Sequence, residues 1–278
     1  MAISAKDVQD LRKRTGAGIM DCKKALVESD GDQEKAIKLL KEWGIAKAAK
    51  KSGREASEGV LVAVISDDSK TGALIEVNCE TDFVANTDEY RAFAKSTAEL
   101  IFSKGYNNTD DLGDDAQTKV KEGISQFKEN IIIGSIKRIE TSGKLSSYIH
   151  TNFKNGTIVS VEGDGTDNDK VNEMGKDIAV HISSFPVSAV SKDDVDQAIL
   201  DEKTAEFTEE IKKQGKPDNI IPKIVQGKIN KFLKEETLYS QSFLKNEDIT
   251  VKQLVDNVSK EIGGALQVKG FIKTVIGA

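Results

Sequence analysis

The spacing of apolar residues changes at about Gly59, and that change restricts the fold class. Over the first forty-odd residues apolar side chains recur every three or four positions, as on one face of a helix. In the stretch that starts at Gly59 the apolar residues instead alternate with polar ones or run together, for example over 60–65, which is typical of strands. The sequence therefore predicts an α+β protein that begins with helices.

Three short helices are predicted at the start of the chain. Ser4 begins the first, with Asp7 three residues later in an arrangement like a capping box. The second covers about 19–28, and the third starts at about Gln33 and carries apolar residues to Trp43. We interpret Gly44 and the lysine-rich stretch 47–54 as the fraying end of that helix and a linker, so that residues 1–54 form one module.

A two-part core with antiparallel sheets is predicted next. A hairpin with strands at 60–65 and 73–77 is followed by a helix that starts at Asn86. A second sheet-forming stretch holds strands at 136–140, 145–150 and 157–161, followed by a helix over about 169–182. A further helix at 250–260 and a strand at 266–276 close the chain. We assign 55–143 to one half of the core and 144–190 with 237–278 to the other, and expect a duplicated topology without a residue-level repeat.

A helical hairpin is predicted to interrupt the second half, over 191–236. Ser191 is expected to cap a long helix that ends at Gly215 and Pro217, and a second helix then runs to about Glu236. Both helices are rich in Lys and Glu, so we expect the hairpin to protrude into solvent.

The composition argues against most kinds of catalytic chemistry. The 278 residues include only two cysteines, Cys22 and Cys79, and two histidines, His150 and His181. A disulfide framework and a multi-histidine metal site are therefore excluded, and the cysteines are expected to be small buried fillers. No apolar run is long enough to span a membrane, which favours a soluble cytoplasmic protein with no membrane contact. We expect no catalytic residue, no metal site and no cofactor.

The charge is unevenly distributed. Residues 1–54 carry 13 basic and 8 acidic side chains, a net charge of +5, whereas the remainder carries −11. Such a basic module is suited to RNA, a membrane surface or an acidic protein face. Because Trp43 is its only aromatic residue, it lacks a stacking platform for single-stranded nucleic acid, and a solvated or protein-binding face is favoured. For Arg12 alone, a solubilising role and a bidentate contact with an acidic partner stay equally open.

Two short segments attract attention without identifying a site. The glycines at 15–18 lie between helices and lack a following Gly-Lys-Ser/Thr, so they are interpreted as an interhelical turn with positive φ and not as a phosphate loop. The segment 81–84 lies between a predicted strand and a helix, where function is often carried. On pattern alone, however, Phe83 is expected to be a core side chain and Asp82 a turn former.

The chain resembles the elongation factor Ts family in two long motifs. Residues 11–26, followed by Gly31, Asp32 and the lysine-rich 47–51, resemble one family signature, and residues 76–85 resemble the other, in the same order. Shorter stretches at 147–150, 215–217 and 270–272 also match the layout of the family.

The resemblance implies a guanine-nucleotide exchange factor for the GTPase elongation factor Tu. In the family the N-terminal module, similar to a ubiquitin-associated fold, docks on the nucleotide domain of the partner. The residues that match this contact are Arg12, Ile19, Met20 and Lys23, with Met in many members at the position of Ile19. The segment Thr81, Asp82, Phe83 and Val84 is then expected to approach the partner's magnesium site. Phe83 would enter between two partner helices, Asp82 would support it by polar contacts, and His150 would touch the partner's third domain.

The resemblance further implies that the hairpin is a coiled-coil or dimerisation element, which gives a homodimer. Some members continue with an extra helix that docks on the partner, whereas this chain stops at Ala278, so that contact is expected to be missing or different. The main alternative is an RNA- or ribosome-associated protein that uses the basic module, which strong salt dependence of RNA binding would reveal. An enzyme is a third interpretation, with no supporting constellation.

Overall fold

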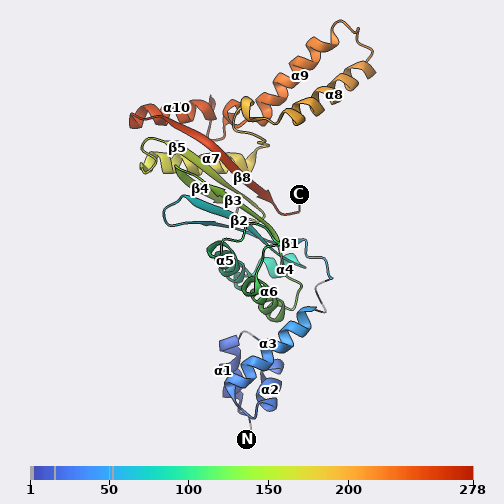
Figure 1. Cartoon of the computed structure of the whole chain (residues 1–278), viewed down its shortest axis with the longest axis vertical. Helices are drawn as coiled ribbons and strands as arrows, with labels where there is room; N and C mark the ends of the chain where they lie inside the picture. Colours follow the sequence, from blue (N-terminus) through green and yellow to red (C-terminus); the bar gives the residue numbers. More distant parts are fainter. Residues whose placement is uncertain (1–2, 16, 50, 52, 278) are drawn as a thin grey trace.

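The computed structural model describes residues 3–15, 17–49, 51 and 53–277, and it confirms an α+β protein. The parts follow one another along the long axis of the molecule (Figure 1). Three helices lie at the N-terminal end, two sheets with their covering helices form the middle, and a helical hairpin projects at the other end (Figure 1).

The N-terminal module consists of α1 (Ala5–Thr15), α2 (Ile19–Glu28) and α3 (Gln33–Ala49). Its small core includes the fully buried side chains of Leu11, Cys22 and Leu26. The predicted cap of α1 is present, since the Ser4 N–H donates to the Asp7 carboxylate at 3.0 Å and the Asp7 N–H donates to Ser4 Oγ at 3.2 Å.

The positive φ expected in the turn between α1 and α2 is not found at Gly18. Gly18 has φ −62° and is the extended residue that precedes α2, so it needs no positive φ. Gly16 lies outside the described residues. The Ala17 N–H donates to Thr15 Oγ1 at 3.3 Å, and a threonine side chain thus helps to form this turn.

Helix α3 runs further than the sequence suggests. It continues through Gly44 to Ala49, so the expectation that Gly44 ends it is wrong. Gly44 is buried against α6 (Asp114–Phe127), where a Cβ atom would lie 3.3 Å from that of Ser125. The glycine therefore allows two helices to approach closely instead of ending one of them.

The first sheet has the strand order β1-β2-β3, and all its pairs are antiparallel. Its strands are β1 (Glu58–Ile65), β2 (Thr71–Cys79) and β3 (Ile132–Glu140). Between β2 and β3 lie α4 (Asp82–Ala85), α5 (Asp88–Ser103) and α6. The expected helix start at Asn86 is wrong by two residues, because Thr87 caps α5 by accepting the Tyr90 N–H at 3.2 Å.

The second sheet has the order β4-β5-β8 and is also antiparallel. Its strands are β4 (Lys144–Ile149), β5 (Asn155–Gly163) and β8 (Leu266–Val275), and its helices are α7 (Asp169–Ser184) and α10 (Val251–Ile262). The expectation that the strand at 136–140 forms a sheet with those at 145–150 and 157–161 is wrong, because it is part of β3 and pairs with β2 of the first sheet, from Thr71↔Glu140 onward. Each sheet is thus completed by the strand that follows its helices, and the expected duplication of topology is present.

The two sheets stack face to face with helices outside them (Figure 1). Successive residues of β1 serve different clusters: Val60 faces α5 and α6, whereas Leu61 packs with Leu145 and Ile158 of the second sheet. Both faces of β1 are covered in this way, which explains its continuous apolar run.

The helical hairpin consists of α8 (Gln197–Lys213) and α9 (Ile221–Glu236) and projects from the second half (Figure 1). The expectation that Ser191 caps α8 is wrong; it caps a short 3-10 turn at Lys192–Asp194, and Asp196 caps α8 by accepting the Ala198 N–H at 2.9 Å. After a second 3-10 turn at Leu238–Ser240, two short strands that were not predicted, β6 (Ser242–Phe243) and β7 (Asn246–Thr250), lead into α10. Within the described ranges no helix is both long and apolar enough to cross a membrane.

Candidate functional site

The short helix α4 presents one large apolar side chain to solvent. Phe83 is 83% exposed, while Val84 and Ala85 pack against the cluster under the first sheet. The pattern-based expectation of a core role for Phe83 is therefore wrong, because a single helical turn buries one side only and its neighbours occupy that side. We call residues 81–85 the exposed tip.

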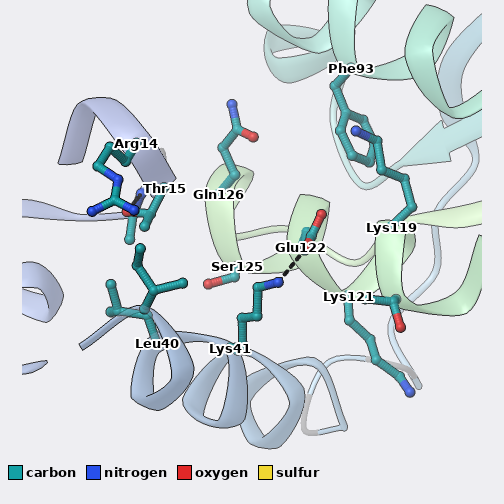
Figure 2. A pocket seen from close by; sticks show the side chains of 14 residues that line it. Arg14, Thr15, Leu40, Lys41, Phe93, Lys119, Lys121, Glu122, Ser125 and Gln126 are labelled. Carbon is teal, nitrogen blue, oxygen red and sulfur yellow. Dashed lines mark hydrogen bonds and ion pairs between the residues drawn. The ribbon is translucent and has the colours of Figure 1, made fainter. Parts of the chain in front are cut away.

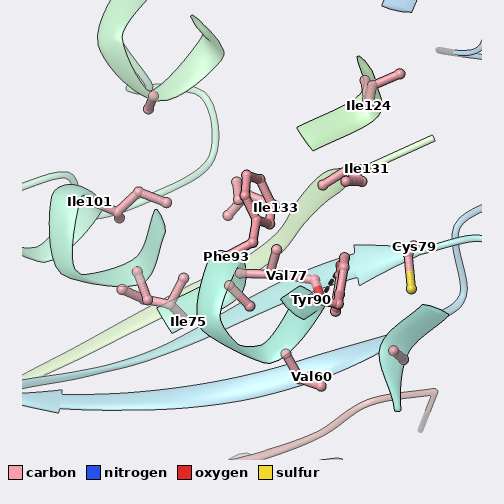
Figure 3. Close-up of a cluster of buried hydrophobic side chains, with 14 of the residues drawn as sticks. Val60, Ile75, Val77, Cys79, Tyr90, Phe93, Ile101, Ile124, Ile131 and Ile133 are labelled. Atoms are coloured by element: carbon pink, nitrogen blue, oxygen red, sulfur yellow. Dashed lines mark hydrogen bonds between the residues drawn. The ribbon is translucent and has the colours of Figure 1, made fainter. Parts of the chain in front are cut away.

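The exposed tip packs against a cluster of buried side chains that includes Val77, Cys79 and Tyr90 (Figure 3). Tyr90 is fully buried, and its hydroxyl donates to the Val77 carbonyl at 3.1 Å. The buried Cys79 thiol donates to the Thr81 carbonyl at 3.3 Å, and burial raises the pKa of this thiol to about 11. Cys79 is thus more than a filler, since it also holds the residue that begins α4.

Thr81 begins α4 and is held from outside the helix. Its Oγ1 accepts the Val84 N–H at 3.4 Å and donates to the carboxylate of Glu129 at 2.6 Å. Asp82 does not form this turn through its side chain, because its exposed carboxylate has no partner in the described part of the chain. Sequence reasoning missed Glu129, which lies 48 residues away and carries no local signal.

The N-terminal module presents a second candidate surface. Ile19, Met20 and Lys23 all face solvent from one side of α2, where Ile19 is 54% and Met20 75% exposed. Val27, which is 56% exposed, continues this side one turn later. Val27 was not among the contact residues predicted from the sequence, although its position four residues after Lys23 places it on the same side of α2.

Arg12 lies on α1 close to this surface. Burial raises the pKa of the Cys22 thiol, and the positive charge of Arg12 acts in the opposite direction. Arg12 is exposed, and among the described residues the side chains of Arg12 and Lys23 form no ion pair or hydrogen bond. Both cations are therefore accessible to an acidic surface.

His150 is exposed in a turn at the end of β4. Its Nδ1 lies 2.9 Å from the Tyr148 hydroxyl, and its carbonyl accepts the Phe153 N–H at 2.8 Å. Phe153 has φ 57°, a left-handed conformation that is uncommon for a bulky residue, and its carbonyl accepts the Leu61 N–H at 2.7 Å. The turn is therefore fixed to β1.

This turn is also connected to the exposed tip. The Arg91 guanidinium of α5 lies over the Phe153 ring and donates to Asn86 Oδ1, at the end of α4, at 3.3 Å. The turn that carries His150, in the second half of the core, is thus linked through Arg91 to the end of α4 in the first half.

A cavity of about 430 Å³ lies between the N-terminal module and α6 (Figure 2). Lys41 of α3 and Glu122 of α6 approach across it, with 4.0 Å between Nζ and Oε1. Lys119 lies over the Phe93 ring at 5.5 Å. The module therefore contacts the core mainly along α3 and leaves a gap near the end of α1.

The second histidine, His181, lies inside the core and not on a surface. His181 is fully buried; its Nδ1 accepts the Leu244 N–H at 3.2 Å and its Nε2 lies 2.8 Å from Gln241 Oε1. Burial lowers the pKa of His181, which favours the neutral ring. In the part of the chain that the structure covers, no three His, Cys, Asp or Glu side chains gather as metal ligands.

Comparison with known proteins gives a consistent result. The profile of the family described as "Elongation factor TS" matches residues 80–278. Elongation factor Ts of Halothermothrix orenii is 39% identical over 286 residues, covering 100% of this chain and 93% of the relative. The protein of the same name from Clostridioides difficile is 38% identical over 282 residues, with 99% and 93% covered. That of Aquifex aeolicus is 38% identical over 291 residues, with 100% and 99% covered.

Proposed function

This chain belongs to the elongation factor Ts family and is a translation elongation factor, and we propose that it works as a guanine-nucleotide exchange factor for elongation factor Tu. The observation that carries the exchange role is the exposed tip. Phe83 is 83% exposed in a four-residue helix whose N-cap residue, Thr81, is bound to the core by several hydrogen bonds. An apolar side chain held in this way is suited to insertion into a partner.

Nucleotide exchange requires no covalent chemistry from the factor. A protein that binds the partner more tightly without GDP than with it weakens GDP binding by the same factor, because the coupling is reciprocal. Phe83 would enter between partner helices near the magnesium ion, with Asp82 making polar contacts. Because magnesium neutralises phosphate charge, displacing its ligands loosens GDP. The factor then acts on the partner's GDP and magnesium, holds no cofactor of its own and is not an enzyme in the covalent sense.

The N-terminal module would supply the docking contact. Arg12 and Lys23 are cationic and without a described partner, and Ile19 and Met20 add exposed apolar area beside them. This combination is suited to an acidic protein surface with an apolar centre, here the nucleotide domain of the partner. His150 would contact its third domain.

The RNA-binding alternative would need an aromatic side chain that stacks on bases, and Trp43 is the only aromatic residue in the sequence of the N-terminal module. Trp43 packs against the core of the module, and Lys24 Nζ lies 4.7 Å from the centre of its ring. The side chain is therefore occupied within the protein and does not offer an open stacking face.

The hairpin is proposed as a self-association element. Its helices pack on each other through a small cluster that includes Ile211, Val225 and Ile229. Ile199 and Ile220 remain 39% exposed outside that cluster. A second copy of the hairpin would cover such side chains and give a homodimer.

The test is the release of a fluorescent GDP from elongation factor Tu. The full chain is expected to accelerate release, and Phe83→Ala to reduce the maximal acceleration by about tenfold or more, as for a buried aromatic contact. Leu244→Ala, which truncates an apolar side chain 38% exposed in the second half, is the control and is expected to behave as wild type. Unchanged release with Phe83→Ala would contradict the role of the tip.

A further inference from the structure

Three consecutive residues after α6 contact three separate parts of the protein. Lys128 Nζ lies 3.4 Å from Asp21 Oδ2 on α2 of the N-terminal module. Glu129 binds the start of the exposed tip, and Asn130 donates from Nδ2 to the Arg54 carbonyl at 2.7 Å, in the segment between the module and β1. We call these residues the 128–130 turn.

Glu129 uses both carboxylate oxygens to bind the start of the exposed tip and the residue before it. Oε2 accepts the N–H groups of Glu80 and Thr81, each at 3.0 Å, and Oε1 accepts the Thr81 hydroxyl at 2.6 Å. Hydrogen bonds to an ionised acceptor are stronger than neutral ones. Because the same hydroxyl caps α4, the position of Glu129 determines where the helix carrying Phe83 begins.

The contact is reciprocal, which makes it more than one side chain on a loop. Glu80 Oε1 accepts the Asn130 N–H at 2.6 Å, and the Glu80 carboxylate also pairs with the Arg54 guanidinium at 3.4 Å. The chain reverses direction at Lys128, which has φ 62° and ends α6. The end of β2 and the 128–130 turn therefore hold each other in place.

We propose that Glu129 is a positioning residue for nucleotide exchange: it holds α4 so that Phe83 projects at a fixed angle, and the 128–130 turn joins the exposed tip to the docking module. This inference rests on the proposed function. A tip that is already ordered loses less conformational freedom when Phe83 enters the partner. Loss of Glu129 should therefore lower the maximal rate of GDP release while docking through α1 and α2 is retained.

The first experiment separates rate from affinity. GDP release from elongation factor Tu is measured against the concentration of the full-length factor for wild type, Glu129→Ala and Glu129→Gln. The alanine variant is expected to lower the plateau rate about tenfold and to change the half-saturating concentration by less than about twofold. The glutamine variant should restore part of the rate, because its amide oxygen still accepts the two backbone N–H groups.

The control is Glu99→Ala, which removes an exposed carboxylate of α5 that pairs only with Lys95 at 3.9 Å among the described residues. It is expected to behave as wild type. A second comparison adds Glu129→Ala to Phe83→Ala, where no further loss is expected because the side chain being positioned is gone. The proposal would be overturned if Glu129→Ala lowered the plateau rate equally in the wild-type protein and in Phe83→Ala. It would also be overturned if Glu129→Ala alone kept the wild-type plateau rate.

A measurement without the partner separates this inference from the proposed function. In the free full-length protein, Glu129→Ala should speed hydrogen exchange of the Glu80 and Thr81 amides about tenfold, since both lose their acceptor. Unchanged exchange at these amides would overturn the positioning role. If hydrogen exchange of these amides is faster in the variant but the wild-type protein does not accelerate GDP release from elongation factor Tu, the positioning role of Glu129 is supported. The proposed function in nucleotide exchange is then refuted.

Discussion

The guanidinium carbon of Arg91 lies 4.3 Å from the centre of the Phe153 ring, so a cation of α5 covers the turn that carries His150. The same guanidinium donates to Asn86 beside the exposed tip, and its buried Nε has no hydrogen-bond partner among the described residues. Stacking on the ring is therefore a main contact of this side chain, and it connects two candidate partner-binding segments.

Arg91→Ala is expected to lower the free energy of unfolding by about 1–2 kcal/mol, because the ring loses its cation and its cover. Arg91→Lys should recover only part of this, since an ammonium cannot stack as a planar guanidinium does. Urea denaturation of the three proteins measures both effects. Equal stability of all three would show that the contact contributes nothing.

Phe83→Ala is expected to leave stability within about 0.5 kcal/mol of wild type, because the removed ring is mostly in water. The substitution thereby separates binding from folding. The measurement is thermal and urea unfolding of the same sample used for GDP release. A loss of more than about 2 kcal/mol would mean that Phe83 supports the fold, and its exchange defect would then need another explanation.

Arg12→Ala combined with Met20→Ala is expected to weaken the complex with elongation factor Tu by about 10- to 100-fold, since a cation and an exposed apolar anchor are lost together. Titration calorimetry gives the affinity, and far-ultraviolet circular dichroism checks the helices. Equal affinity for variant and wild type would refute the docking role. RNA binding by the wild type with a strong salt dependence would instead favour the RNA alternative.

Replacing residues 197–236 with a short Gly/Ser linker is expected to change self-association more than exchange. The retained segments on either side of the hairpin lie together, since the Leu238 N–H donates to the Ala189 carbonyl and the Tyr239 N–H to the Val190 carbonyl, each at 3.0 Å. The remaining fold should therefore close without strain. Sedimentation gives the mass, and the same oligomeric state with and without the hairpin would count against dimerisation through it.

Stability is expected to fall in mild acid partly because of His181. Burial lowers its folded-state pKa below the ordinary 6.5, so below about pH 6.5 the unfolded chain binds a proton that the folded chain does not. Its contribution is constant above that pH and is lost progressively as the pH falls toward the folded-state pKa. Urea denaturation between about pH 7.5 and 5.5 should therefore show a steeper loss for wild type than for His181→Gln. Parallel curves would contradict this.

Local patterns were enough to predict most elements of the fold. Ser4 with Asp7 marked the first helix, and the apolar run at 60–65 marked β1. The placement of 136–140 was wrong because strand pairing depends on partners distant in sequence, and β3 pairs with a strand some sixty residues earlier. The prediction for Gly44 was wrong because a glycine that permits helix contact and one that ends a helix look alike in sequence.

The candidate site was only partly accessible from sequence. The resemblance singled out Thr81 to Val84, and residues 11–26, but pattern alone placed Phe83 in the core. Its exposure follows from the one-turn length of α4, which no periodicity in four residues can reveal. Glu129 was missed because its partners Glu80 and Thr81 come near it only after β2 and α6 have packed together.

Both native thiols are covered, which has a practical consequence for labelling. The protein has two cysteines, Cys22 and Cys79, and both are buried with pKa values raised by that burial. Little reactive thiolate is therefore present at neutral pH in the native state. A maleimide dye should react with one cysteine introduced on the surface while both native residues are kept, and a sudden gain of two further reactive thiols would report unfolding.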